Sequence, residues 1–279
     1  MAGIHQAAYG LYTKATTWLL PMGLQDLLLR TGKRMTGTRF VFLACFPKSG
    51  STLLSESLNG LPGWRRLNSI PPDLTREQEP IREYVIRDWA AMGQNVVFKN
   101  HVSHSDHLIG LLAHFRMHRV FLVRNLADVC CSLSDHFDNE ATDWPFLTLS
   151  GSQLNEIDRS GRRADFIVDL AIPWFVNCYA SWMRFVSNGG ECQVVRYEDL
   201  ISDPAALVGR AIRAAGLSHS GDEINSAISR AENLPNRSRL NVGVSGRGRD
   251  FLMANPHVGE SIRRYVSYYP DVDFSPVFE

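Results

Sequence analysis

The sequence predicts an α/β fold, with one domain built on a central parallel β-sheet that is flanked by helices. A length of 279 residues fits this class, because α/β chains of this size often form a single unit. Short apolar runs, rich in β-branched and aromatic residues, alternate with helical stretches, as in parallel sheets covered on both faces. The strands are expected at Phe40 to Phe46, Asn95 to Phe98, Arg119 to Val123 and Gln193 to Arg196.

The helices between these strands carry their own start and stop signals. Residues 164–186 are apolar but are interrupted by Pro173, which predicts a pair of core helices rather than one long helix. Asp203-Pro204 is a typical helix start, Gly216 is expected to end that helix, and Asn255-Pro256 is expected to open the last one. Residues 61–74, 138–163 and 235–250 are expected to be irregular loops that form the rim of a site.

Composition and charge exclude several classes of protein. Lys and Arg total 29, as do Asp and Glu, so the net charge is zero and no nucleic-acid partner is expected. The cysteines lack CxxC spacing, which is typical of reduced thiols; the pair Cys130-Cys131 is interpreted as helix packing, with a redox pair as the alternative. The N-terminus fits neither a signal peptide nor a membrane span, and the expected location is the cytoplasm.

In a parallel sheet, ligands bind beyond the carboxyl ends of the strands, so the residues after each run matter most. After the first strand comes the loop Pro47 to Thr52, with sequence PKSGST, followed by a helical run. Backbone N–H groups at that helix start, together with Lys48, would bind a phosphate. The loop is not a Walker A motif, because Lys48 precedes its only glycine. The alternative is a capped turn with a surface lysine.

The second and third strands end in further candidate site residues. Lys99 and His101 follow the second strand, where His101 would serve as a general base; a structural histidine is the alternative. No metal site is expected, because a partial match to an HxHxDH pattern has Val102 at its first histidine position. Arg124 lies at the end of the third strand, beside a helix that Asn125 would cap. Its side chain would either bind an anion or form an internal salt bridge.

Tyr197 directly follows the fourth strand, and its ring face or hydroxyl could contact a nucleobase. The two acidic residues that follow it, Glu198 and Asp199, are expected to tie loops together rather than to act as catalytic acids.

Together these segments resemble the sulfotransferase family that depends on 3′-phosphoadenosine 5′-phosphosulfate (PAPS). The resemblance rests on PKSGST at 47–52, KNH at 99–101, FLVRNLADVCCSL at 121–133 and RYEDL at 196–200, in the family's order. It spans roughly residues 38–270 and implies a fold like that of P-loop NTPases. The expected division is an N-terminal helical segment over 1–37 and a sulfotransferase domain over 38–279.

The resemblance assigns roles to individual residues. Lys48 matches the lysine that contacts the bridging oxygen of the phosphosulfate, His101 matches the catalytic base, and Lys99 matches a second active-site lysine. The resemblance implies no metal. The matched cofactor-binding residues are Ser49, Gly50, Ser51 and Thr52 in the 5′-phosphate loop that Pro47 opens, Arg124 and Ser132 at the 3′-phosphate, and Tyr197 near the adenine.

Two departures from the family pattern affect the predicted cofactor site. Leu53 stands where many members have a tryptophan that stacks on adenine. The C-terminal RKGxxG motif survives only as the glycines of residues 241–246, so Arg247 or Arg249 is expected to supply the missing charge, with Arg237 and Arg239 as alternatives.

The expected reaction moves the sulfuryl group of PAPS to a hydroxyl, or an amine, of a small molecule or lipid. A nucleotide kinase and an inactive nucleotide-binding relative are the alternatives. The first 39 residues carry five basic residues and one acidic residue, a net charge of plus four, with several leucines. Peripheral membrane contact is one interpretation of this segment, and packing on the body or on a partner subunit of a homodimer is the favoured one.

Overall fold

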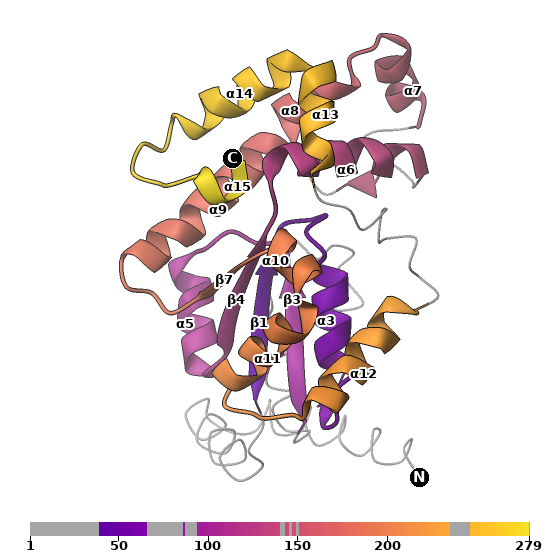
Figure 1. The fold of residues 1–279 in the computed structure, drawn as a ribbon. Coiled ribbons are helices and arrows are strands. Elements are labelled where there is room, and N and C mark those ends of the chain that lie inside the picture. Colours follow the sequence, from indigo (N-terminus) through magenta and orange to yellow (C-terminus); the bar gives the residue numbers. More distant parts are fainter. Residues whose placement is uncertain are drawn as a thin grey trace, which may run out of the picture.

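The computed structural model describes residues 39–65, 86, 94–139, 143–144, 147–148, 151–234 and 246–278. It is a single α/β domain whose parallel sheet is flanked by helices, which confirms the predicted fold class (Figure 1). The N-terminal segment 1–37, for which packing on the body or on a partner subunit is favoured over membrane contact, lies outside the described residues, as do Arg237 and Arg239.

The main sheet has the strand order β2-β3-β1-β4-β7, and every neighbouring pair is parallel. All four predicted strands are present, with small shifts at their ends. The edge strand β2 was not predicted, because a strand of two residues carries no alternating pattern. The strands are β1 (Phe40–Cys45), β2 (Trp64–Arg65), β3 (Asn95–Asn100), β4 (His118–Val123) and β7 (Gln193–Arg196).

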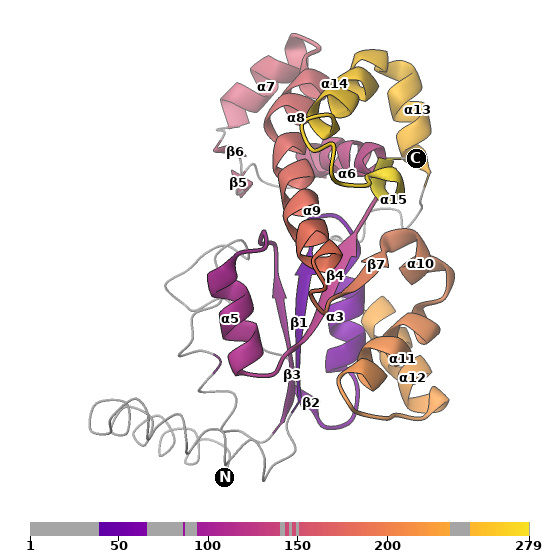
Figure 2. The same ribbon diagram turned by 90° about the vertical axis from the view of Figure 1, so that its left-hand side faces the viewer.

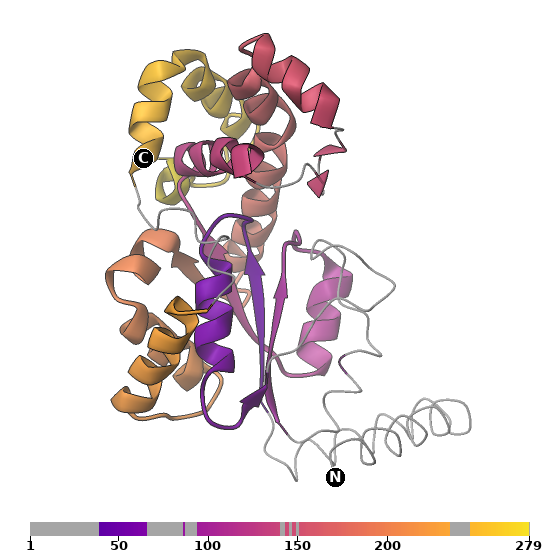
Figure 3. The same cartoon turned by 90° about the vertical axis from the view of Figure 1, so that its right-hand side faces the viewer.

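The central strand β1 explains why helices cover both faces of the sheet. All six of its residues are buried, and successive side chains point to opposite faces, into two separate apolar clusters. One face is covered by α3 (Ser51–Asn59), α11 (Pro204–Ala214) and α12 (Gly221–Glu232), and the other by α5 (Asp106–His114) and α9 (Ile172–Ser187) (Figures 2 and 3).

A layer of further helices lies beyond the carboxyl ends of the strands, above the sheet in Figure 1. It therefore covers the edge where a parallel sheet binds its ligands. These helices are α6 (Leu126–Asn139), α7 (Gly151–Arg159), α8 (Arg163–Leu170), α13 (Arg247–Ala254), α14 (Pro256–Val266) and α15 (Ser275–Phe278). The helix α10 (Tyr197–Ser202) follows β7, and a small antiparallel pair joins β5 (Asp143–Trp144) to β6 (Leu147–Thr148).

The predicted pair of core helices is confirmed as α8 and α9, which are separated at Ala171 just before Pro173. The span Arg163–Ser187 is long and apolar enough to cross a membrane by length and composition alone. Within the domain, however, Trp182 is fully buried, stacks on Phe121 and donates its indole N–H to the Val102 carbonyl at 2.9 Å. This part of α9 therefore packs on the sheet as a core helix.

Two of the helix signals behave as predicted. The Asp203 carboxylate accepts the Ala206 N–H at 2.9 Å at the start of α11, and Gly216 ends that helix with φ +77°. Asn255 behaves differently, because its side-chain amide donates to the Phe251 carbonyl of α13 instead of capping α14. The helix α14 still begins at Pro256, but the short α15 follows it, so α14 is not the last helix.

The expectation of an irregular loop over 138–163 is wrong for its second half, which forms α7. The helix is polar overall, with Leu154 buried, and this polarity is typical of a loop as well as of a surface helix. Arg163 then joins α7 to α8 through paired hydrogen bonds of 2.7 and 2.6 Å to Asp158, which lower the pKa of that carboxyl.

The adjacent cysteines behave as packing residues of α6. Both thiols are free and buried, and burial raises the pKa of Cys130 and of Cys131. A thiol held in its protonated form is a poor nucleophile and a poor redox partner. The structure therefore favours helix packing over the redox interpretation.

Candidate active site at the carboxyl ends of the strands

The loop after β1 turns sharply into α3. Lys48 and Gly50 both have positive φ angles, of 65° and 79°, and a residue with a side chain rarely adopts this conformation. The Ser49 side chain is fully buried, and its hydroxyl donates to the Phe46 carbonyl at 2.6 Å, which closes the turn. Because α3 has a glycine as its N-cap and no side-chain cap, the N–H groups of its first turn suit an anion.

Tyr197, at the start of α10, packs against this loop. A Cβ atom on Gly50 would lie 2.9 Å from the Tyr197 ring, so glycine is needed there for close approach as well as for its φ angle. The ring also contacts Arg124, whose guanidinium carbon lies 4.2 Å from the ring centroid. Tyr197 is buried and holds the loop and Arg124 together.

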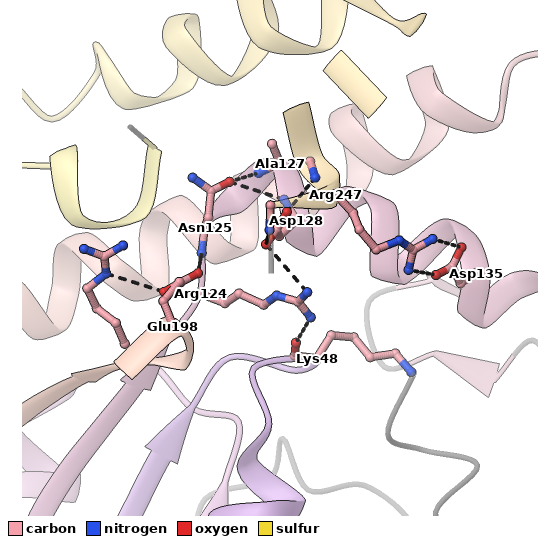
Figure 4. Close-up of polar contacts among 11 residues, drawn as sticks. Lys48, Arg124, Asn125, Ala127, Asp128, Asp135, Glu198 and Arg247 are labelled. Carbon is pink, nitrogen blue, oxygen red and sulfur yellow. Dashed lines mark hydrogen bonds and ion pairs between the residues drawn. The ribbon is translucent and has the colours of Figure 1, made fainter. Parts of the chain in front are cut away.

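Arg124 connects the loop to the helix layer (Figure 4). Its guanidinium donates to the Lys48 carbonyl at 2.9 Å and lies 3.7 Å from the Asp128 carboxylate. Asp128 also accepts the backbone N–H groups of Gly246 at 2.8 Å and of Gly248 at 2.5 Å. The internal ion pair is therefore present, but it is long, and the Asp128 carboxylate is shared with two backbone N–H groups.

The residues around Arg124 show how that strand end is held. The Asn125 side chain caps α6 as predicted, accepting the Ala127 N–H at 2.9 Å. Glu198 accepts the Asn125 N–H at 3.4 Å and pairs with Arg196 at 3.4 Å, which is the structural role expected for it (Figure 4).

The face of α6 beside the loop carries a row of polar side chains. Asp128, Ser132 and His136 are spaced four residues apart, and residues with this spacing lie on one face of a helix. Ser132 is buried one turn beyond Asp128. One turn further, the Lys48 ammonium lies 2.9 Å from Nδ1 of His136. The loop and α6 therefore contact each other through Arg124 and through Lys48.

His101 stands immediately after β3, next to the end of β1. It is 8% exposed, and its Nδ1 lies 2.9 Å from the Cys45 carbonyl oxygen. Since a carbonyl only accepts, Nδ1 carries the proton, and in the neutral ring Nε2 is then the basic nitrogen. This arrangement suits a general base at the carboxyl edge of the sheet.

Lys99 lies inside β3 rather than after it, because the strand continues to Asn100. Lys99 pairs with Leu43 in the register between β1 and β3. Side chains alternate along a strand, so Lys99 faces the same side as Val97, which belongs to the cluster under α3. This is the side of the sheet on which the helix after the loop begins.

The two arginines expected to replace the missing C-terminal charge lie on α13. Arg247 binds the Asp135 carboxylate of α6 with both amino groups, at 2.6 and 3.3 Å, and this pairing raises the pKa of the guanidinium (Figure 4). Arg249 is exposed. Arg247 thus docks α13 on α6, while the cofactor-binding role of Arg249, on the first turn of α13, stays a prediction.

Sequence reasoning missed three features of the site. They are the contacts of Asp128 with Arg124 and with the amino end of α13, the contact of His136 with Lys48, and the close approach of α13 to α6. The four-residue spacing along α6 is the only local signal that could have indicated the first two. Across the described ranges, from residue 39 to residue 278 with their gaps, no three His, Cys, Asp or Glu side chains are grouped to hold a metal ion.

The close approach of α13 to α6 leads to a prediction about stability. A Cβ atom on Gly248 would lie 2.5 Å from the Asp128 backbone nitrogen, which cannot move cheaply. Gly248→Ala is therefore expected to destabilise the protein by about 1–3 kcal/mol, the usual cost of overpacking, as measured by urea unfolding. Gly110→Ala on α5 is the matched control, because its Cβ meets nothing within 4 Å. Equal midpoints for Gly248→Ala and the wild type would contradict the packing argument.

Comparison with known protein families and solved structures shows which family the chain belongs to. The sulfotransferase domain family matches residues 39–233, while no curated protein sequence shows significant similarity to the chain. Among solved structures, mouse sulfotransferase SULT7A1 complexed with PAP is similar with a TM-score of 0.59 and 13% identity, over 85% of this chain and 86% of that chain.

Two further solved structures are similar to the chain with lower TM-scores. Retinol dehydratase in complex with androsterone and the inactive cofactor PAP has a TM-score of 0.47 and 14% identity, over 85% of this chain and 82% of that chain. Sulfotransferase STF1 of Mycobacterium tuberculosis H37Rv has a TM-score of 0.39 and 15% identity, over 79% and 84%. Because the family match covers more than half of the sequence, the protein belongs to the sulfotransferase family, the enzyme class that its motifs predict.

Proposed function

We propose that this sulfotransferase takes the sulfuryl group from PAPS and passes it to a hydroxyl, or an amine, of a small-molecule or lipid acceptor in the cytoplasm. The observation that carries the proposal is the convergence of the loop Pro47 to Thr52, His101 and Arg124 at the carboxyl ends of β1, β3 and β4. The mouse relative with the same fold is complexed with PAP, which supports this choice of cofactor.

The donor set of the site suits a nucleotide with phosphates at two positions. The first-turn N–H groups of α3, with Ser51 and Thr52, would hold the 5′-phosphate, and Arg124 with Ser132 would hold the 3′-phosphate. Tyr197 acts in this scheme by orienting Arg124 across its ring face. When bound, PAPS supplies an already activated sulfuryl group, so the protein needs to position groups and stabilise charge.

His101 is assigned the role of base in this reaction. Its Nδ1–H donates to the Cys45 carbonyl, which fixes the ring and leaves Nε2 to accept the proton of the acceptor hydroxyl. The negative charge that develops on the phosphate side of the breaking bond would be stabilised by Lys48, Lys99 and the N–H groups of the loop. The free state of all five cysteines supports the proposed cytoplasmic location.

Binding of the desulfated cofactor is the first test of the proposal. At about 100 times its Kd, a ligand that binds only the folded state stabilises that state by about 2.7 kcal/mol. PAP is therefore expected to raise Tm in a concentration-dependent way, whereas AMP, which lacks the 3′-phosphate, is expected to raise it less. An equal response to both nucleotides would count against a site for two phosphates.

The acceptor can then be identified with labelled PAPS. A screen over phenols, sterols, sugars, lipids and amines, with PAP release as a second readout, is expected to reveal transfer to at least one hydroxyl class. Magnesium-dependent turnover of ATP in place of transfer from PAPS would favour the nucleotide kinase alternative.

A further inference from the structure

The contact between Lys48 and His136 joins two segments 88 residues apart, the phosphate loop and the helix α6. Lys48 is the residue to which the proposed function assigns the charge at the breaking bond. It is partly buried and has a positive φ angle of 65°. What holds its side chain in place therefore bears directly on the reaction.

The chemistry of the contact fixes which group accepts. An ammonium has three N–H donors and no lone pair, so Nδ1 of His136 must accept, at 2.9 Å. In the neutral imidazole the proton is then on Nε2. This hydrogen bond uses one of the three ammonium N–H groups, and the role assigned to Lys48 requires another of them to donate to an anion held in the loop.

Both ends of Lys48 are held by the same part of the fold. Its backbone carbonyl accepts from Arg124, at the end of β4, and its ammonium donates to His136, on the helix that directly follows. Arg124 pairs with Asp128, and Asp128 and His136 lie on one face of α6. A long, flexible lysine side chain is thus restrained at both ends, which reduces the rotamer freedom it must lose when it meets the bridging oxygen.

We propose that His136 is a positioning residue for Lys48. It holds the ammonium beside the phosphate loop, so that the ammonium is already in place when negative charge develops on the leaving phosphate. The inference rests on the role assigned to Lys48 in the proposed function. His136 itself need not touch the cofactor or the acceptor in this scheme. Its loss is therefore expected to act on turnover through Lys48, and to leave the phosphate-binding residues in place.

Substitution of His136 separates an acceptor role from a packing role. Loss of a hydrogen bond to a charged group typically changes a rate or equilibrium constant by about 10- to 100-fold. His136→Leu is therefore expected to lower kcat with PAPS by at least about 10-fold. The affinity for PAP, measured by calorimetry, is expected to change by less than about 2-fold. His136→Asn keeps an acceptor near the position of Nδ1 and is expected to recover most of kcat. His114→Leu, at the far end of α5, is the matched control.

A double-mutant cycle with Lys48→Met completes the test. If His136 acts through Lys48, His136→Leu has no further effect on kcat in the Lys48→Met background. Full activity of Lys48→Met would show that the assigned role of Lys48 is wrong. A strong loss in Lys48→Met with no loss in His136→Leu, or equal losses in His136→Leu and His136→Asn, would instead overturn the positioning role of His136.

Discussion

Replacing His101 is expected to lower kcat by about 10²- to 10⁴-fold, the usual contribution of a positioned general base. The structure places this side chain at the carboxyl edge of the sheet and uses its Nδ1–H to bind the Cys45 carbonyl. The basic Nε2 is therefore the nitrogen lost to the reaction in His101→Ala. His101→Asn is the sharper variant, because its amide lies near the position of Nδ1 and can still donate to the Cys45 carbonyl but cannot accept a proton.

The measurement is steady-state transfer from labelled PAPS, together with calorimetric binding of PAP. Both His101 variants are expected to bind PAP with nearly wild-type affinity, since the phosphate contacts come from the loop and from Arg124. His107→Gln, an exposed position on α5, serves as the control and is expected to keep full turnover. Wild-type turnover in His101→Asn would show that another group, or the acceptor itself, takes the proton.

Replacing Arg124 with alanine is expected to weaken PAP binding by about 10- to 100-fold. Hydrogen bonds to charged groups are worth about 1.5–3 kcal/mol, and this guanidinium is the charged group assigned to the 3′-phosphate. The same change removes a donor to the Lys48 carbonyl and leaves the Asp128 carboxylate with only the backbone N–H groups of Gly246 and Gly248. Some loss of stability is therefore expected as well.

Arg124→Lys keeps the test informative if the alanine variant folds poorly. It retains the charge but loses the planar fork that reaches Lys48 and Asp128 together, so an intermediate affinity for PAP is expected. Arg119→Ala, at the opposite end of the same strand, is the control and is expected to bind PAP normally. Normal PAP affinity in a folded Arg124→Ala protein would refute the role at the 3′-phosphate.

The sequence was informative wherever a short pattern of residues determines the local structure. Buried parallel strands read as continuous apolar runs, so β1, β3, β4 and β7 were predicted, and with them the edge that gathers Lys48, His101 and Arg124. Helix caps are also local, which is why Asp203 and Asn125 were identified. The strand β2 was missed because it has only two residues, and α7 was missed because its sequence is polar overall.

The sequence by itself determined the order of the elements, the loop chemistry at each strand end and the family to which these motifs belong. Only the tertiary structure decided which partners those residues meet: Arg124 on the face of Tyr197, Asp128 on the amino end of α13, and Lys48 against His136. These contacts join segments up to 120 residues apart, and their geometry depends on how the helix layer packs over the sheet. Local propensity cannot encode such packing, because the energy of each contact exists only once both elements are in place.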